Sequence, residues 1–437
     1  MVRGLIAMNL DELLNTPVPP ATKGWPALAG TLPLREAGRR GWNLLREDLP
    51  LPVAVLKGSA LAHNSRWMRG FLEQFDVWLC PHGKTTMAPQ LFARQLADGA
   101  WGITVATVQQ LMVCRRFGVP RVLMANQLVG RQAVRAVLAE LQADPGFEFL
   151  CLVDSLDGVE LLRRELEGMP LGRPFEVLLE GGVAGGRTGC RSIEQALAVA
   201  RRVAAVPELA LVGIEGFEDV VGGGIAEAEP KIVAFLDYLV ELARACAREN
   251  LFASGPVILS AGGSKYFDQV TARFRAADLG HPVEIVLRSG CYLSHDSKIY
   301  TDAFARLRER TPAVERLGEG LRPALELWAT VQSTPEPGLA ILTMGKRDVS
   351  YDIDLPLVRQ WFRPGLHQQP QALGLGFKVM GLYDQHTCLR VPADSPLRVG
   401  DLISFGISHP CTTFDKWRLL YVVDDDYTVT EAIRTFF

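Results

Sequence analysis

The sequence predicts an α/β fold in which a (β/α)8 barrel is joined to a β-rich second domain. Two observations favour the barrel: eight apolar segments alternate with amphipathic helical segments, and no Gly-x-Gly-x-x-Gly motif follows the first of them. A third observation is the change after about residue 305, where short apolar runs separated by Gly and Pro replace the helical periodicity. An open doubly wound sheet is the alternative, and the missing glycine motif argues against it.

The barrel strands are expected where the sequence is apolar almost throughout, as in parallel strands that helices cover on both faces. These segments are Val77–Leu79, Gly102–Ala106, Arg121–Ala125, Phe147–Val153, Phe175–Leu179, Leu209–Ile214, Val257–Leu259 and Val283–Leu287. Helices are expected at Gln109–Arg116, Gln132–Leu141, Gly158–Glu165, Ile193–Val203 and Lys231–Arg244. A strand at Val53–Leu56 and a helix at Ser59–Phe75 precede them, and residues 50–304 are assigned to the barrel.

The β-rich domain is expected to combine residues 1–49 with residues 305–437. Its C-terminal part contains short apolar segments with turn residues between them. These segments are Ala324–Gln332, Leu339–Thr343, Phe377–Tyr383, Cys388–Val391, Asp401–Ile407 and Leu419–Val423. The N-terminal residues, with a helical stretch near Leu34–Leu45, are expected to pack on this domain because the barrel occupies the middle of the chain.

Composition excludes several classes of partner. A hydrophobic content of 48% with 22% charged residues is ordinary for a soluble globular protein, and the net charge of −3 favours neither nucleic acid nor an anionic membrane. No apolar run is long enough to span a bilayer, and the N-terminal apolar run is too short for a secretory signal. The eight cysteines lack a disulfide-type spacing, which indicates a reducing, cytoplasmic location.

The first candidate for chemistry is Lys84, in the segment LCPHGKTT that follows the first barrel strand. Residues at this end of a strand lie on the face where such barrels carry out chemistry. A partly desolvated lysine there loses some of its preference for the charged form and can form a Schiff base with an aldehyde. A lysine in solvent is the alternative for Lys84 considered alone.

Two glycine-rich turns follow the seventh and eighth predicted strands, where barrels commonly bind phosphate through backbone N–H groups. The candidate cofactor-binding residues are Ser260, Gly262, Gly263 and Ser264 from SAGGS, and Ser289, Gly290, Cys291 and Tyr292 from RSGCY. A phosphate site on one side of the barrel mouth and an amine on the other suit pyridoxal 5'-phosphate. The combination therefore predicts that cofactor.

Three further residues are candidates for the same mouth. Arg187, in the glycine-rich segment after the fifth strand, could pair with the cofactor's phenolate oxygen or with a substrate carboxylate; an arginine in solvent is the equal alternative. His82 flanks Lys84 and is expected to touch the cofactor ring. His386 is a candidate catalytic base or ligand.

His409 and Cys411 are the candidate metal ligands, in the segment ISHPCTT at the end of an apolar strand. In an extended chain, residues two apart point to the same side, so both side chains can reach one ion. An imidazole with a thiolate suits Zn²⁺ better than Mg²⁺ or Ca²⁺. The alternative is a half-buried histidine beside a structural cysteine.

Four motifs, PHGKT around Lys84, SAGGS, RSGCY and SHPCTT, resemble in sequence order those of the fold-type III pyridoxal-phosphate enzymes. Within this family the resemblance is to the branch that contains D-serine dehydratase and D-threonine aldolase. It implies an alanine-racemase-like barrel, Lys84 as the Schiff-base lysine, phosphate on the glycine turns, and a catalytic zinc on His409 and Cys411. It also implies a homodimer in which the partner's β-rich domain completes the mouth.

The chain departs from the family pattern at several positions. Cys80 stands where the family often has arginine, and Thr86 with Met87 stands where it often has His-Lys. Phe217 replaces the tyrosine common in a Gly-Tyr-Glu-Gly segment, so no role of that phenol is expected here. The His-x-Cys pair resembles the dehydratases, whereas the aldolases tend to have His-x-Asp.

The predicted reaction is β-elimination of water from a D-β-hydroxy amino acid, most simply D-serine to pyruvate and ammonia, with zinc assisting departure of the hydroxyl oxygen. Retro-aldol cleavage of D-threonine-like substrates uses the same groups and is the nearest competing reaction. Less favoured are a racemase, which needs no metal pair, and a non-catalytic pyridoxal-phosphate-binding protein, since those of this fold lack a second domain. A sugar-phosphate barrel enzyme is also considered, and the absence of the cofactor's absorbance would favour it.

Overall fold

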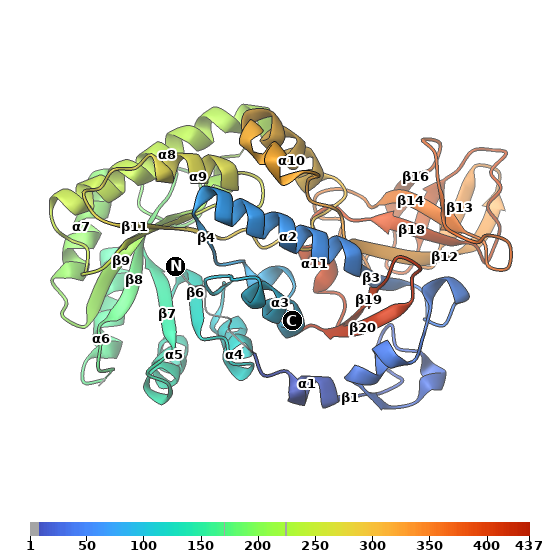
Figure 1. The fold of residues 1–437 in the computed structure, drawn as a ribbon, viewed down its shortest axis with the longest axis horizontal. Helices are drawn as coiled ribbons and strands as arrows, with labels where there is room; N and C mark the ends of the chain where they lie inside the picture. The colour runs from blue at the N-terminus through green and yellow to red at the C-terminus, as the bar shows by residue number, and fades with distance from the viewer. Residues whose placement is uncertain (1–7, 170, 223–224) are drawn as a thin grey trace.

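The computed structural model describes residues 8–169, 171–222 and 225–437. Figure 1 shows two parts, a parallel sheet surrounded by helices and a region built mainly of antiparallel strands. The predicted barrel and the predicted β-rich second domain are both confirmed. Among the helices of the described ranges, none combines the length and the apolarity needed to cross a membrane.

All eight predicted barrel strands are present. They are β4 (Trp78–Leu79), β5 (Ile103–Val105), β6 (Arg121–Gln127), β7 (Glu148–Val153), β8 (Phe175–Gly181), β9 (Leu209–Gly216), β10 (Val257–Ala261) and β11 (Val283–Leu287). They pair in parallel in the order β4-β11-β10-β9-β8-β7-β6-β5. A parallel bridge between His82 and Thr104 joins the two ends of this sheet, so the strands close into a barrel.

Helices cover the outside of the barrel in Figure 1. They are α2 (Gly58–Phe75), α3 (Pro89–Ala97), α4 (Val108–Arg116), α5 (Arg131–Ala143), α6 (Leu156–Leu166), α7 (Ile193–Ala204), α8 (Ile225–Arg248), α9 (Phe267–Arg275) and α10 (Ile299–Arg310). Three of them begin after a capping hydroxyl, since Thr107, Ser155 and Ser192 each accept a hydrogen bond from a backbone N–H of the first turn. Each of these helices therefore starts where the sequence supplies the cap.

The second domain is built around antiparallel strands. They are β12 (Leu325–Glu336), β13 (Leu339–Leu342), β14 (Leu357–Phe362), β15 (Gln371–Ala372), β16 (Lys378–Leu382), β17 (Thr387–Arg390), β18 (Leu402–Gly406), β19 (Leu419–Val423) and β20 (Val429–Arg434). The strand β3 (Val53–Lys57) pairs with β12 and β19. It therefore belongs to this sheet, although the predicted boundary at residue 50 assigned it to the barrel.

The N-terminal segment packs on the second domain. It contains α1 (Asp11–Asn15), the strand pair β1 (Pro17–Val18) and β2 (Leu32–Pro33), and the short 3-10 helices η1 (Ala27–Ala29), η2 (Leu34–Arg39) and η3 (Leu44–Arg46). The helical stretch predicted near Leu34–Leu45 is thus two 3-10 turns. Trp25 and Leu34 lie in one buried cluster with Trp328 and Tyr421 of the second domain. This apolar burial holds the segment in place.

Candidate functional site

Lys84 lies at the C-terminal end of β4, in the 3-10 turn η4 (Gly83–Thr85). The turn is closed by the N–H of Thr86, which donates to the carbonyl oxygen of Gly83 at 3.1 Å. The Lys84 side chain is exposed within the barrel mouth, yet desolvation by the surrounding protein lowers the pKa of its amine. The charges of Arg187 and Arg288 lower this pKa further, so the neutral amine is more accessible than in a free lysine.

A cavity with about 550 Å³ of empty space, including its open mouth, contains this amine. It is lined by His82, Lys84, Ala106, Ala125, Asn126, Glu180, Arg187, Thr188, Glu215, Phe217, Gly263 and Arg288. The guanidinium of Arg187 lies 4.8 Å from the ring centroid of Phe217. The structure therefore brings Lys84, His82 and Arg187 together with the first glycine turn.

An ion pair between Arg288 and Glu215 lies at this cavity, with side-chain exposures of only 5% and 1%. Arg288 Nη2 also donates to the carbonyl oxygen of Gly216 at 2.7 Å. Burial raises the pKa of Glu215 to about 8, against the opposing charge of Arg288. Sequence reasoning did not single out either residue, although an acidic residue near the end of an apolar strand was a usable signal.

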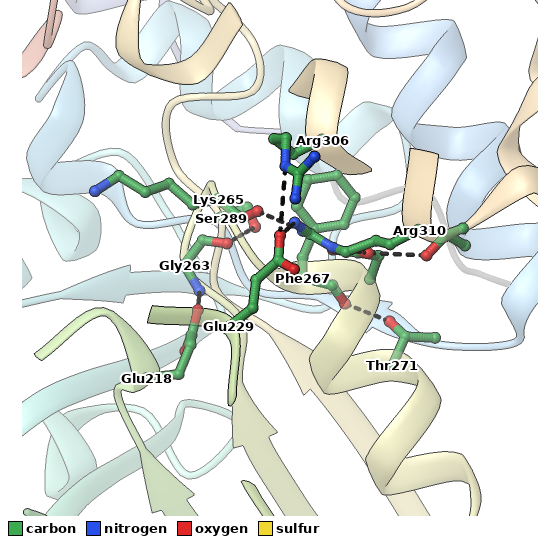
Figure 2. A network of polar contacts seen from close by, with 11 residues as sticks. Glu218, Glu229, Gly263, Lys265, Phe267, Thr271, Ser289, Arg306 and Arg310 are labelled. Carbon is green, nitrogen blue, oxygen red and sulfur yellow. Dashed lines mark hydrogen bonds and ion pairs between the residues drawn. The ribbon is translucent and has the colours of Figure 1, made fainter. Parts of the chain in front are cut away.

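The carboxyl group of Glu218 lies against the first glycine turn. Glu218 accepts hydrogen bonds from the N–H groups of Gly262 at 3.1 Å and Gly263 at 2.6 Å. Ser289 Oγ donates to the carbonyl oxygens of Gly262 and Gly263, which ties the two glycine turns together. Figure 2 shows this chain of contacts from Glu218 through Gly263 to Ser289. Two of the N–H groups expected to hold phosphate are therefore used by Glu218.

The second glycine turn packs directly on the turn that carries Lys84. A Cβ added at Gly290 would lie 2.5 Å from the carbonyl oxygen of His82 and 2.7 Å from Thr85 Oγ1. The N–H of Cys291 donates to Ser264 Oγ at 3.2 Å. The N–H groups of Ser264 and Gly290 have no partner among the described residues. Two unpartnered N–H donors on the glycine turns suit the phosphate of an anionic aldehyde cofactor such as pyridoxal phosphate.

Of the predicted catalytic and cofactor-binding residues, His82, Lys84, Arg187 and Gly263 line this cavity, and the others do not. Ser260 is buried, and its Oγ donates to the carbonyl oxygen of Val286 at 3.0 Å. The side chain of Tyr292 is also buried and hydrogen-bonded to Gln95, and burial raises the pKa of its phenol. His386 is exposed in the turn between β16 and β17. A cofactor-binding role for Ser260 and Tyr292, and a catalytic role for His386, remain predictions.

Cys411 begins the short helix α11 (Cys411–Phe414) and lies beside the barrel's second glycine turn. Its Sγ is 3.8 Å from Cys291 Sγ and 3.7 Å from Thr85 Oγ1. The contact with Cys291 and burial raise the pKa of the Cys411 thiol, and the charge of Lys84 opposes them. The predicted thiol of the metal pair therefore lies at the barrel mouth.

His409 is held by two carboxylates. Its Nδ1 lies 2.6 Å from Asp352 Oδ2, and its backbone N–H donates to Asp296 Oδ2 at 3.0 Å. The chain at His409 has a φ of 63°, and Cys411 is helical, so the segment is not the extended strand that the prediction assumed. Within the described residues, no three His, Cys, Asp or Glu side chains converge on a common point. The imidazole and thiols nevertheless have the donor chemistry that zinc prefers.

Two family models match the chain: an alanine racemase N-terminal domain over residues 56–253 and a putative serine dehydratase domain over residues 324–423. A D-threonine aldolase from Arthrobacter sp is 25% identical over 387 residues, which cover 88% of this chain and 91% of the relative. The solved D-threonine aldolase from Filomicrobium marinum has a TM-score of 0.71 at 21% identity, covering 89% of this chain and 95% of its own. D-threo-3-hydroxyaspartate dehydratase from Delftia sp. HT23 has a TM-score of 0.70 at 21% identity, with 90% and 99% covered.

Proposed function

Because this chain belongs to the fold-type III pyridoxal-phosphate family, we propose that it is a pyridoxal-phosphate-dependent enzyme that eliminates water from a D-β-hydroxy amino acid. The simplest case is the conversion of D-serine to pyruvate and ammonia. The observation that carries this proposal is one cavity that contains the amine of Lys84 and the first glycine turn. The thiol of Cys411 lies outside the cavity lining, 3.7 Å from Oγ1 of Thr85, the residue that follows Lys84.

In this proposal different residues would bind different groups of the cofactor. Lys84 would bind its aldehyde, and the N–H groups of Ser264 and Gly290, which have no partner among the residues that the structure describes, would hold its phosphate. Arg187, which lines the same cavity, would pair with its phenolate oxygen or with the substrate carboxylate. Pyridoxal phosphate, when bound, supplies a conjugated ring that delocalises the electron pair left when the substrate's Cα loses its proton.

Lys84 is the proposed base for that proton. Desolvation and the nearby guanidinium groups of Arg187 and Arg288 lower the pKa of its amine. A lowered pKa increases the fraction of neutral amine near neutral pH, and only the neutral form accepts a proton at Nζ. The arginines thus favour the protonation state in which Lys84 can act.

In this proposal His409 and Cys411 would bind the zinc ion. Zinc, when bound, supplies a Lewis acid that stabilises the charge on the departing β-oxygen. Asp352 would orient the imidazole through the 2.6 Å contact at Nδ1. As support from a relative, a variant of a D-threo-3-hydroxyaspartate dehydratase with one cysteine replaced by alanine is a metal-free form.

Retro-aldol cleavage of D-threonine-like substrates is the second candidate. It is favoured by the similarity to a D-threonine aldolase over 88% of this chain. Elimination is favoured by the match of residues 324–423 to a serine dehydratase domain, since this range contains both His409 and Cys411. The two reactions give different products, so one assay separates them.

The test is turnover of D-serine, D-threonine and L-serine by the protein loaded with pyridoxal phosphate and zinc. We expect keto acid and ammonia from D-serine, and little turnover of L-serine. A chelator should stop elimination and leave the cofactor's visible absorbance unchanged, and added zinc should restore activity. Glycine with an aldehyde as the main products would support the aldolase instead. The homodimer remains a prediction that light scattering would test.

The matched variants are Lys84→Ala and Lys378→Ala. Lys84→Ala should remove both the cofactor's lysine-bound absorbance and the activity, because no other lysine of the described residues lines the cavity. Lys378 is exposed in β16, so Lys378→Ala should keep both. Absence of a lysine-bound cofactor in the unmodified protein would overturn the proposal.

A further inference from the structure

A pair of thiols joins the two domains at the barrel mouth. Cys291 comes from the loop after β11, and Cys411 comes from the second domain, 120 positions further along the chain. Their sulfur atoms are 3.8 Å apart, too far for a disulfide, whose sulfurs are about 2.05 Å apart. Two thiolates on one tetrahedral zinc, each at about 2.3 Å, have sulfurs about 3.8 Å apart. The observed separation therefore equals the spacing that a shared zinc requires.

The histidine beside this pair is arranged like a metal ligand. Nδ1 of His409 contacts Asp352 Oδ2 at 2.6 Å, which leaves Nε2 as its other nitrogen. Thr412 Oγ1 donates to the second oxygen of Asp352 at 2.7 Å, so the carboxylate is itself held in place. A carboxylate that fixes the histidine tautomer and the ring orientation is the usual partner of a zinc-binding imidazole.

We propose that Cys291 is a third protein ligand of the zinc assigned above to His409 and Cys411. The inference rests on the proposed function for the presence of the metal. The resulting site has two thiolates and one imidazole and leaves one position open for the substrate's β-oxygen. Three protein ligands with one open position is the composition of catalytic zinc sites.

The proposal requires a movement of His409. Among the described residues the three donors do not meet at one point, so metal binding must draw the imidazole toward the sulfur pair. The two sulfurs, in contrast, already have the separation needed. Zinc would thus link a barrel loop to the second domain beside Thr85, in the turn that carries Lys84.

The deciding experiment is zinc X-ray absorption spectroscopy on the unmodified protein, loaded with cofactor and one equivalent of zinc. We expect two sulfur neighbours and at least one nitrogen neighbour in the zinc shell. A shell with one sulfur would overturn the proposal. A Cys291–Cys411 disulfide in protein purified under reducing conditions would overturn it as well.

Cobalt substitution and zinc competition give a second, independent readout. Cys291→Ser should weaken zinc binding by at least about 100-fold, since loss of an outer partner alone costs about 10- to 100-fold. It should also reduce the thiolate-to-cobalt charge-transfer absorbance by about half. Cys388→Ser is the matched control, because Cys388 is a free cysteine within β17 and should affect neither quantity. Unchanged binding and absorbance in folded Cys291→Ser would overturn the proposal.

These measurements test the assignment of Cys291 as a zinc ligand separately from the proposed elimination reaction. Two zinc-bound sulfurs in a protein that does not turn over D-serine would support the ligand assignment and contradict the proposed function. One zinc-bound sulfur in an active dehydratase would contradict the ligand assignment and support the proposed function. A protein that binds no zinc would contradict the ligand assignment and the zinc-assisted elimination together.

Discussion

Arg288 and Glu215 form a buried ion pair between the residue that follows β11 and the strand β9. The side chain of Arg288 is 5% exposed and that of Glu215 is 1% exposed. Removing one charge leaves the other buried without a partner. Because burial raises the pKa of Glu215 to about 8, we expect Arg288→Met to lower the free energy of unfolding by about 3–5 kcal/mol above that pH and by less below it, measured by urea denaturation.

The double variant Arg288→Met/Glu215→Leu tests the reason for that loss. With both charges absent, no buried charge is left unpaired, so the double variant should be more stable than Arg288→Met alone. Arg322→Met removes an exposed arginine that pairs with Glu319 and should cost less than about 1 kcal/mol. A double variant less stable than the single one would contradict this account of the pair.

Gly290 allows the second glycine turn to approach the turn that carries Lys84. A methyl group at Gly290 would lie 2.5 Å from the carbonyl oxygen of His82, and this backbone atom cannot rotate away. Gly290→Ala should therefore destabilise the protein by about 1–3 kcal/mol and weaken cofactor binding. Gly374→Ala is the control, because no atom lies within 4 Å of its added methyl group. If the contact with His82 were unimportant, thermal unfolding and cofactor titration would give the same results for Gly290→Ala and Gly374→Ala.

Arg187 affects the protonation of Lys84. Desolvation is the main cause of the lowered pKa of Lys84, and the positive charge of Arg187 adds to it. Arg187→Met removes that charge and should raise the pKa of Lys84, so the amine should become reactive only at higher pH. Competitive acylation followed by mass spectrometry of the cofactor-free protein measures this midpoint. Arg322→Met should leave it unchanged, and a midpoint shifted to lower pH in Arg187→Met would contradict the prediction.

His295 makes stability depend on pH. Burial lowers its pKa from 6.5 to about 4 in the folded state. Between these pH values His295 is protonated in the unfolded chain and neutral in the folded protein. The free energy of unfolding therefore falls as the pH falls. In that window the unfolding free energy of the unmodified protein, relative to His295→Asn, should fall by about 1.4 kcal/mol per pH unit. Asparagine does not titrate there and tolerates the φ of 47° at this position. If the difference in unfolding free energy between the two proteins did not change with pH, the lowered pKa of His295 would be contradicted.

Asp352 is predicted to act on zinc through His409. Asp352→Asn keeps the size of the side chain but weakens its hold on the imidazole, so zinc affinity should fall by about 10- to 100-fold. Chelator competition measures the change. Asp384→Asn is the control, because Asp384 is 72% exposed in its contact with Arg347. Equal affinities in the two variants would show that Asp352 does not position the imidazole.

Local patterns located the barrel strands because each of them is apolar over consecutive residues. The same patterns missed β14 (Leu357–Phe362) and β20 (Val429–Arg434), which contain Arg359, Gln360 and Glu431. These strands are only partly buried, so polar side chains are tolerated on them and the apolar signal is weak. The partners of β3 were also missed, because pairing between strands far apart in the chain has no local pattern.

The sequence by itself determined the alternation of strands and helices, the place of Lys84 after the first barrel strand, and the glycine turns after the last two. Each of these depends on the periodicity or conformational freedom of neighbouring residues. Only the tertiary structure decided that Glu215 faces Arg288, that Glu218 takes two glycine N–H groups, and that Cys291 meets Cys411. These contacts join residues from separate elements, and packing of the whole barrel against the second domain sets their distances.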